Sequence, residues 1–212
     1  MEYMKILAIL AHADDETLGC GGILSKYPGA TVIVLSDGLL DVRGERQNNA
    51  TAFKKACNVL MSKPFMVGLP DQFFESRRLS SIIIKIEKII KANKIEFDTV
   101  ITHSPHDINR DHRITFEAAE VIARPKNNPV SLICCEIPSD ASWGNRFRPN
   151  LFVPVSEFLF EMKKTAMYCY ENELMKHPHP NSIPCFRTLM SYRGNQCGAD
   201  MAEAFEVVRW CI

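Results

Sequence analysis

Short apolar runs alternate along the chain with longer amphipathic stretches. The apolar runs predict six β-strands, over residues 6–10, 31–35, 65–67, 99–102, 132–136 and 151–154. The longer stretches predict five helices, over residues 15–26, 46–61, 79–93, 111–123 and 156–175. Strands that alternate with helices in this way are typical of an α/β protein with a largely parallel sheet.

The stretch over residues 79–93 shows the helical period most clearly. Its leucine and isoleucines recur every three or four residues, and its lysines occupy the other positions. A helix with this pattern packs its apolar stripe on the core. We therefore expect these isoleucines to be core residues and assign them no further role.

Length and composition limit the class of protein. A chain of 212 residues is long enough for one well-buried domain and short for two, so we expect a single domain over residues 1–212. Its 25 basic and 25 acidic residues cancel, which argues against nucleic acid or an anionic membrane as a partner. No apolar stretch approaches the ~18 residues of a transmembrane helix. Eight cysteines without a CxxC pair are typical of core residues in a reducing compartment, so we expect a cytoplasmic protein.

His12, Asp14, Asp15 and Glu16 follow the first predicted strand directly. Imidazole and carboxylate groups suit zinc, and a catalytic zinc typically keeps three protein ligands and a water. Because adjacent side chains point in different directions, one aspartate can bind a metal while the other faces the bound water. The alternative is structural: Asp14 or Asp15 caps the helix that begins here, and Glu16 favours its first turn.

A second polar cluster, residues 103–113, follows the fourth predicted strand and contains three histidines and two aspartates. In open α/β sheets, ligands bind in the crevice beyond the carboxyl ends of the strands. Two such clusters are harder to explain as helix caps than one. We therefore expect them to converge on one metal site, with the second cluster supplying an imidazole.

Five short segments stand in order along the chain: AHADDE at 11–16, SDG at 36–38, LPD at 69–71, DINRDHR at 107–113 and AEAF at 202–205. Together they resemble the LmbE/PIG-L family of zinc-dependent N-deacetylases. The first and fourth segments are specific, and the others would be weak alone. The resemblance implies a Rossmann-like three-layer α/β fold with a mostly parallel β-sheet, and hydrolysis of the N-acetyl group of an amino-sugar-containing substrate.

By this resemblance, His12, Asp15 and His112 are the zinc ligands and Asp14 is the general base. The chemistry is self-consistent, because zinc lowers the pKa of its water toward ~7 and Asp14 can accept the proton. Zinc then stabilises the oxyanion. Fe²⁺ is the alternative metal.

The chain departs from the family at residue 109. Asn109 stands where many members have a histidine that stabilises the oxyanion or protonates the leaving amine. An asparagine can donate a hydrogen bond to an oxyanion, but it cannot protonate an amine. Proton delivery then falls to Asp14, His106 or His179, so that Asp14, Asn109 and His179 are the catalytic candidates. The alternative for both histidines is an exposed loop position.

Four residues are expected to bind substrate: Asp37, Arg46, His106 and Arg146. Arginine binds sugar hydroxyls and phosphates, yet it is also commonly exposed, and Asp37 can equally brace its loop. Arg146 together with Arg148 favours a phosphate-bearing substrate. The expected substrates are an N-acetylglucosamine-like sugar, a nucleotide sugar or a glycoconjugate precursor. The oligomeric state stays open, a homo-oligomer included.

Two other functions fit parts of the sequence. The first is a dinucleotide-binding dehydrogenase. Its glycine-rich fingerprint and ribose-binding acid are partly matched by Gly19, Gly21 and Gly22 and by Asp37 after the second strand. The G-x-G-x-x-G spacing is absent, however, and the acidic turn would repel a pyrophosphate, so we expect these glycines to allow close packing of helix and sheet. The second is a catalytically idle sugar-binding protein on the same fold, which Asn109 alone favours.

Overall fold

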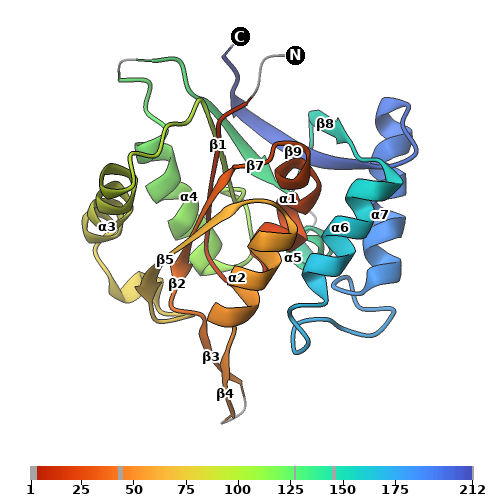
Figure 1. Cartoon of the computed structure of the whole chain (residues 1–212), viewed down its shortest axis with the longest axis horizontal. Helices are drawn as coiled ribbons and strands as arrows, with labels where there is room; N and C mark the ends of the chain where they lie inside the picture. The colour runs from red at the N-terminus through yellow and green to blue at the C-terminus, as the bar shows by residue number, and fades with distance from the viewer. Residues whose placement is uncertain (1–3, 43–44, 127, 145–146, 212) are drawn as a thin grey trace.

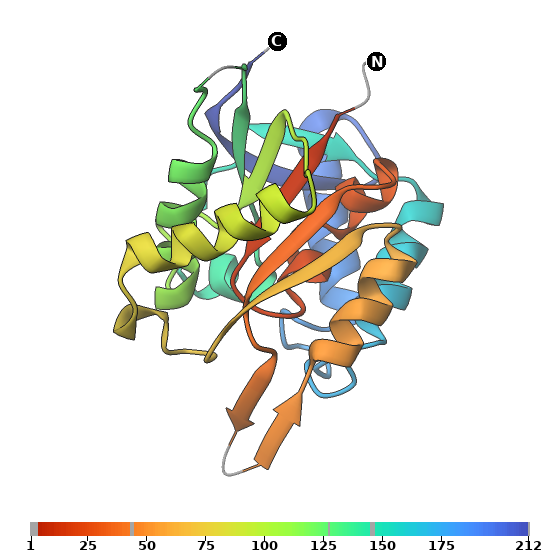
Figure 2. The same ribbon diagram turned by 60° about the vertical axis from the view of Figure 1, so that its left-hand side comes forward.

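The computed structural model describes residues 4–42, 45–126, 128–144 and 147–211, with the backbone alone over residues 40–42 and 45–47. In this part of the chain, a seven-stranded sheet has helices packed on both faces (Figures 1 and 2). Its strands are β1 (Ile6–Leu10), β2 (Thr31–Ser36), β5 (Lys63–Leu69), β6 (Thr99–Thr102), β7 (Ser131–Cys135), β8 (Leu151–Pro154) and β9 (Ala202–Arg209). The helices are α1 (Asp15–Lys26), α2 (Ala50–Val59), α3 (Leu79–Ala92), α4 (Arg110–Ile122), α5 (Pro138–Gly144), α6 (Glu157–Met167) and α7 (Ile183–Cys197), with a short 3-10 turn η1 (Phe74–Ser76). The predicted α/β class with a mostly parallel sheet is confirmed.

The strand order of the sheet is β5-β2-β1-β6-β7-β9-β8, and β9 pairs antiparallel with both β7 and β8 whereas the other pairs are parallel. β1 pairs in parallel with β2 on one side and with β6 on the other. The chain therefore builds the sheet outward in opposite directions from the β1–β6 pair, and the crevice at such a switch point is where α/β sheets bind ligands. Both polar clusters of the sequence begin there, because His12 follows β1 and residues 103–113 follow β6.

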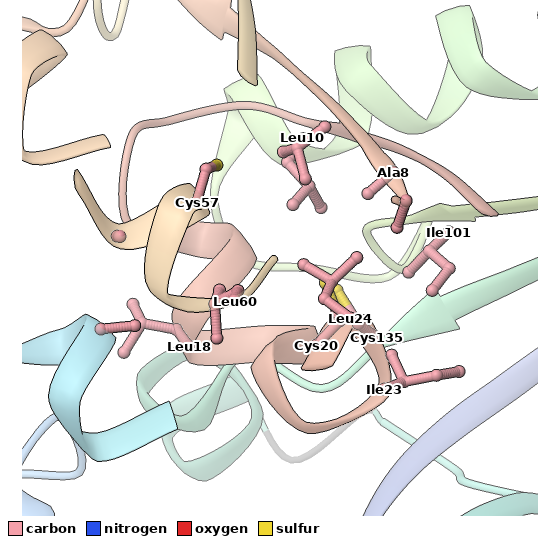
Figure 3. Close-up of a cluster of buried hydrophobic side chains, with 14 of the residues drawn as sticks. Ala8, Leu10, Leu18, Cys20, Ile23, Leu24, Cys57, Leu60, Ile101 and Cys135 are labelled. Carbon is pink, nitrogen blue, oxygen red and sulfur yellow. The ribbon is translucent and has the colours of Figure 1, made fainter. Parts of the chain in front are cut away.

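Different helices cover the two faces of the sheet. α1, α2, α6 and α7 pack on one face, and α3 and α4 pack on the other (Figure 1). Figure 3 shows side chains of α1, among them Leu24, gathered with those of β1, β6 and β7 in the first core. In the second core, Ile82 and Ile86 of α3 are completely buried, which confirms that the helical stripe over residues 79–93 is core.

Several elements differ from the expected ones. Residues 45–48 form β4 (Glu45–Asn48), which pairs with β3 (Leu39–Val42) in a projecting hairpin, so the helix expected from residue 46 begins only at Ala50 (Figure 2). The last expected helix ends at Met167 rather than at residue 175. The sequence pattern did not predict β9, α5 and α7. β9 lacks an uninterrupted apolar run and is a strand because it pairs with both β7 and β8, and α7 buries only a narrow stripe of three residues.

The glycines of α1 allow helix and sheet to approach closely, as expected. A Cβ atom added at Gly19 would lie 2.6 Å from Cys135 Sγ of β7. One added at Gly22 would lie 2.9 Å from Glu203 Oε2 of β9. Neither position has room for a larger residue without a shift of its neighbours.

A buried ion pair supports α1 at its midpoint, where Cys20 interrupts the helix with a φ of −148°. Glu203 accepts hydrogen bonds from Gly22 N and Ile23 N at 2.7 and 2.8 Å, so its carboxylate caps the second half of the helix. Lys163 Nζ of α6 lies 2.7 Å from Glu203 Oε1. Both side chains are almost completely buried, and together they join α1, α6 and β9.

Two further expectations concern the whole chain. None of the helices in the described ranges is long and apolar enough to span a membrane. The eight cysteines are unpaired, and Cys20, Cys57, Cys134 and Cys135 are buried as expected of core residues, whereas Cys197 is exposed. The expectation of a core position is therefore wrong for Cys197.

Candidate metal centre and active site

Side-chain atoms of His12, Asp15 and His112 converge at the carboxyl end of β1. His112 Nε2 lies 3.2 Å from His12 Nδ1, and Asp15 Oδ2 lies 3.6 Å from each of these nitrogens. Donor atoms about 2.1 Å from a tetrahedral zinc ion would be roughly 3.4 Å apart. The three donors therefore have a spacing that could hold a metal ion such as zinc.

His12 turns its second ring nitrogen toward carboxylates. Its Nε2 lies 3.4 Å from Asp111 Oδ2 and 3.5 Å from Asp71 Oδ1. Burial lowers the pKa of His12, but hydrogen bonds to Asp111 and Asp15 outweigh burial and raise this pKa well above its ordinary value. Such carboxylates fix the orientation of a metal-binding imidazole and make it a stronger ligand.

His112 is held in the same manner from the start of α4. Its Nδ1 lies 3.0 Å from Asp107 Oδ2 and 3.5 Å from Asp140 Oδ2. Burial raises the pKa of Asp140 to about 6, and the charge of Asp107 adds to this rise. The ring of His112 is therefore fixed with Nε2 facing His12 and Asp15.

His103 lies directly behind Asp15 and is completely buried. Its ring stacks on that of His112, with centroids 3.8 Å apart. His103 Nε2 accepts a hydrogen bond from Ala11 N at 2.9 Å and lies 3.2 Å from Asp15 Oδ2. Asp15 Oδ2 also accepts a hydrogen bond from His12 N at 2.8 Å, so the carboxylate has little freedom to turn.

Asp14 occupies the N-cap position of α1, but its side chain makes no capping hydrogen bond. Its backbone has a φ of 133°, which is unfavourable for an aspartate. Glu16 Oε2 accepts a hydrogen bond from Asp14 N at 3.1 Å, and Tyr170 OH donates to Glu16 Oε1 at 2.7 Å. The alternative of a simple helix cap is therefore wrong for Asp14, whose carboxylate lines a cavity instead.

The adjacent carboxylates Asp14 and Asp15 differ in their affinity for protons. Burial raises the pKa of Asp14 well above its ordinary value, and the charges of Asp15 and Glu173 raise it further. Burial acts on Asp15 in the same direction, but His112 and His103 outweigh it and hold the pKa of Asp15 well below its ordinary value. A carboxylate that stays ionised suits a cation, and one with a raised pKa suits proton transfer.

A cavity of about 200 Å³ opens beside these residues at the carboxyl edge of the sheet. Its described lining contains no lysine or arginine and carries carboxylates at five positions, which are Asp14, Asp15, Asp71, Asp140 and Glu173. Glu173 and Asn181 come from the segment between α6 and α7, so the C-terminal part of the chain closes one side of the cavity. Glu173 Oε1 accepts a hydrogen bond from Asn49 Nδ2 at 2.9 Å, which fixes its position at the wall.

Asn109 lines the same cavity and caps α4. Its Oδ1 accepts a hydrogen bond from Asp111 N at 2.9 Å, and its own N–H donates to Asp107 Oδ1 at 2.8 Å. Because Oδ1 is used in the cap, the Nδ2 group is the part of Asn109 suited to donate a hydrogen bond to a ligand.

Other candidates from the sequence lie away from the cavity. Asp37 Oδ1 accepts a hydrogen bond from Leu39 N at 2.9 Å and so braces its loop, and Gly38 lines the cavity in its place. His106 is exposed, and neither it nor His179 belongs to the cavity lining. The side chain of Arg46, in β4, and the whole of Arg146 lie outside the described residues.

Several residues of the site had no role assigned from the sequence. Asp107 and Asp111 stand in the same segment as His112, so their role in orienting the imidazoles had a sequence signal. Asp71 lies in the LPD segment, but its approach to His12 depends on the path of the chain after β5. Glu173 carries no local signal at all, because only the packing of α6 brings it to the cavity.

Comparisons with known proteins agree with this geometry. The model of the PIG-L family, described as GlcNAc-PI de-N-acetylase, matches residues 7–123, more than half of the chain. The protein described as uncharacterized deacetylase YaiS, from Escherichia coli strain K12, is 31% identical over 179 residues, which cover 76% of this chain and 88% of that protein.

Solved structures share the fold over nearly the whole chain. The conserved protein TT1542 from Thermus thermophilus has a TM-score of 0.76 at 20% identity, covering 99% of this chain and 96% of that one. N,N'-diacetylchitobiose deacetylase from Pyrococcus horikoshii has a TM-score of 0.75 at 18% identity, covering 97% of this chain and 84% of that one. The fold, the family match and the identity to a deacetylase together lead to one conclusion: the chain belongs to the PIG-L (LmbE-like) family of deacetylases.

Proposed function

We propose that the chain is a metal-dependent hydrolase that removes the N-acetyl group of an amino-sugar-containing substrate, with zinc, or alternatively Fe²⁺, held by His12, Asp15 and His112. The observation that carries this proposal is the convergence of their donor atoms, which lie 3.2–3.6 Å from one another. Two imidazoles and one carboxylate are a usual ligand set for catalytic zinc. The carboxylates behind both imidazoles support the same assignment.

Asp14 acts as the general base in this proposal. Zinc, when bound, lowers the pKa of a coordinated water and polarises the acetamide carbonyl. Asp14 lines the cavity beside the candidate ligands, and its raised pKa suits it to accept the proton of the attacking water. Since water attacks directly, no residue of the chain becomes acylated.

Asn109 assists by donating from Nδ2 to the developing oxyanion. Its Oδ1 is held in the cap of α4, which leaves the amide donor for the substrate. The leaving amine takes its proton from Asp14, because this side chain lines the cavity and holds the proton that the water gave up. His179 and His106 stay as alternative donors, although both lie outside the cavity lining.

The proposed substrate is an uncharged N-acetylated amino sugar or glycoside. The family description and the names of the relatives support an N-acetylated sugar. Five carboxylates and no lysine or arginine in the described lining disfavour a phosphate close to the scissile amide. This argues against the phosphate-bearing substrate that Arg146 and Arg148 favoured from the sequence alone.

The test combines metal analysis with a deacetylation assay on the purified chain. We expect about one zinc or iron per chain and acetate release from N-acetylglucosamine or N,N'-diacetylchitobiose. Bound metal without acetate release from any N-acetylated sugar would instead support the idle sugar-binding protein. Absence of both metal and turnover would contradict the proposal.

A further inference from the structure

Trp143 is a large apolar side chain that the fold leaves exposed beside the active-site cavity. Its exposed fraction is 61%. It belongs to α5, whose Ser139 and Asp140 line the cavity. Side chains three positions apart lie on the same face of a helix, about 5–6 Å from each other. Trp143 therefore lies one turn beyond Asp140, on the face of α5 that carries the cavity wall.

The indole of Trp143 also contacts the turn between α6 and α7 that contributes Asn181 to the cavity. Its ring meets that of His179 edge to face, with centroids 5.3 Å apart. His179 belongs to a turn that is held by backbone hydrogen bonds. Its N–H donates to Lys176 O at 3.1 Å, and its carbonyl accepts from Ser182 N at 3.0 Å. His179 Nδ1 accepts a hydrogen bond from Asn181 N at 3.0 Å, and Asn181 lines the cavity.

The size of the cavity limits what it can hold. Sites for drug-sized ligands typically measure ~300–1,000 Å³, whereas this cavity measures about 200 Å³. A substrate larger than one small ring must therefore extend past the rim, where Trp143 is exposed.

The polar side chains near Trp143 suit the binding of a sugar ring. A pyranose ring has one apolar C–H face, which packs on an aromatic ring, and a rim of hydroxyl groups that need polar partners. Polar side chains flank Trp143 on both sides, namely His179 on the turn and Ser139 and Asp140 on α5.

We propose that Trp143, packed against His179, is a stacking platform for a second pyranose ring that is glycosidically linked to the N-acetylated sugar in the cavity. The substrate class is then an N-acetylated disaccharide or oligosaccharide, and Trp143 determines specificity for it. This inference rests on the proposed function for the position of the first sugar.

The kinetic test compares two substrates in the zinc-loaded full chain. We expect Trp143→Ala to lower kcat/KM for N,N'-diacetylchitobiose by about 3- to 10-fold, mainly through KM, and to leave kcat/KM for N-acetylglucosamine unchanged. Trp143→Phe should keep most of the disaccharide preference. Phe158→Ala is the matched control, since Phe158 is also exposed, at 71%, and belongs to α6, which, unlike α5, contributes no residue to the cavity lining.

A binding measurement tests the platform without turnover. The chain has two tryptophans, and Trp210 lies with Met4 and Lys5 in a different cavity. The titrants are the deacetylated sugars chitobiose and glucosamine, which undergo no turnover. In the Trp210→Phe variant, the fluorescence emission of Trp143 should shift on titration with chitobiose and respond little to glucosamine. Circular dichroism checks that each variant folds.

The outcomes separate this inference from the proposed function. If the unchanged protein releases no acetate from N,N'-diacetylchitobiose or N-acetylglucosamine, the proposed function fails. The emission of Trp143 alone then tests whether this residue is a stacking platform. Equal losses on both sugars in Trp143→Ala, or no loss on either, would overturn the platform. An emission of Trp143 that responds equally to chitobiose and glucosamine, or to neither, would also overturn it. The same holds if an octyl glycoside of N-acetylglucosamine is deacetylated as well as the disaccharide.

Discussion

The two halves of helix α1 each lie against buried carboxylates, and the charges of these carboxylates are balanced in opposite ways. At its midpoint, Glu203 is matched by Lys163, and backbone N–H groups of Gly22 and Ile23 take up its oxygens. At its first turn, Asp14 and Asp15 share a cavity with further carboxylates, and the described lining offers no lysine or arginine to match them. The first arrangement is complete within the chain, whereas the second has an excess of negative charge.

This difference separates a structural group from a site. A buried pair that satisfies its charges and hydrogen bonds contributes to holding the fold together, and it needs nothing from solution. A group of carboxylates and imidazoles with an excess of acceptors is stabilised by a cation, and the spacing of His12, Asp15 and His112 fits one. The comparison predicts that changes at the midpoint alter stability and that changes at the first turn alter metal binding and turnover.

The largest effect is expected from removal of a proposed ligand. His12→Ala and Asp15→Ala should each lose most of the bound metal and essentially all turnover, because two remaining donors hold zinc poorly. Both chains should stay folded, since the core of α1 is not touched. Metal content per chain by mass spectrometry, together with circular dichroism, checks this. Full metal occupancy in both variants would contradict the ligand assignment.

Asp14→Asn tests the base at the same turn. The amide cannot accept the proton of the water, so turnover should fall by roughly 10²- to 10⁴-fold, the usual contribution of general base catalysis. Metal content should not change, because Asp14 is not a proposed ligand. Steady-state kinetics on the metal-loaded protein measures the loss. Unchanged turnover would mean that Asp14 has no part in the chemistry.

Asn109→Ala removes a donor from the cavity wall and should cost about 10²- to 10³-fold in rate, comparable to the loss of one oxyanion-hole donor. Metal content should stay the same, and Asn109→His should be tolerated. If a loop histidine provides the acid instead, Asn109→Ala should be nearly silent, and His179→Ala or His106→Ala should change the pH profile of turnover. Full activity in all three alanine variants would leave Asp14 as the proton shuttle without a helper.

Glu203→Ala tests the balanced half of α1. It leaves Lys163 buried without its partner, which typically costs about 3–5 kcal/mol in the free energy of unfolding. Urea denaturation measures this cost, and turnover per folded molecule should not change. The control is Glu161→Ala, which breaks the partly exposed Lys164–Glu161 pair on the same helix as Lys163 and should cost under about 1 kcal/mol. Similar losses in both variants would show that the buried pair has no special role.

The sequence predicted the elements whose own residues show the pattern of their burial. Every residue of β1 and β6 is buried because both faces of a central parallel strand are covered, and α3 has a clear apolar stripe because one face packs on the sheet. The two halves of the candidate metal site follow β1 and β6 directly, so their convergence could be predicted from the rule that ligands bind at strand ends.

The remaining parts depend on contacts between distant segments. The β3–β4 hairpin contains the polar residues Glu45 to Asn48, whose strand character comes from pairing rather than from their own pattern. β9 becomes a strand by insertion between β7 and β8. Glu173 and Asn181 reach the cavity only because α6 and α7 pack on the sheet, so neither residue was a candidate from the sequence.

The smallest expected effect concerns Glu173, which adds negative charge to the first turn from across the cavity. Burial comes first among the causes that raise the pKa of Asp14, and the charge of Glu173 raises it further. A base must be deprotonated, so turnover falls as the pH drops through the pKa of Asp14. Glu173→Gln removes one like charge and lowers this pKa, and the acidic limb of the kcat profile should move to lower pH with an unchanged plateau. The glutamine can still accept the hydrogen bond from Asn49. Glu171→Gln, at an exposed position outside the cavity lining, should leave the limb in place. A limb that stays in place in Glu173→Gln, or moves to higher pH, would mean that excess negative charge at the cavity does not set the proton affinity of the base.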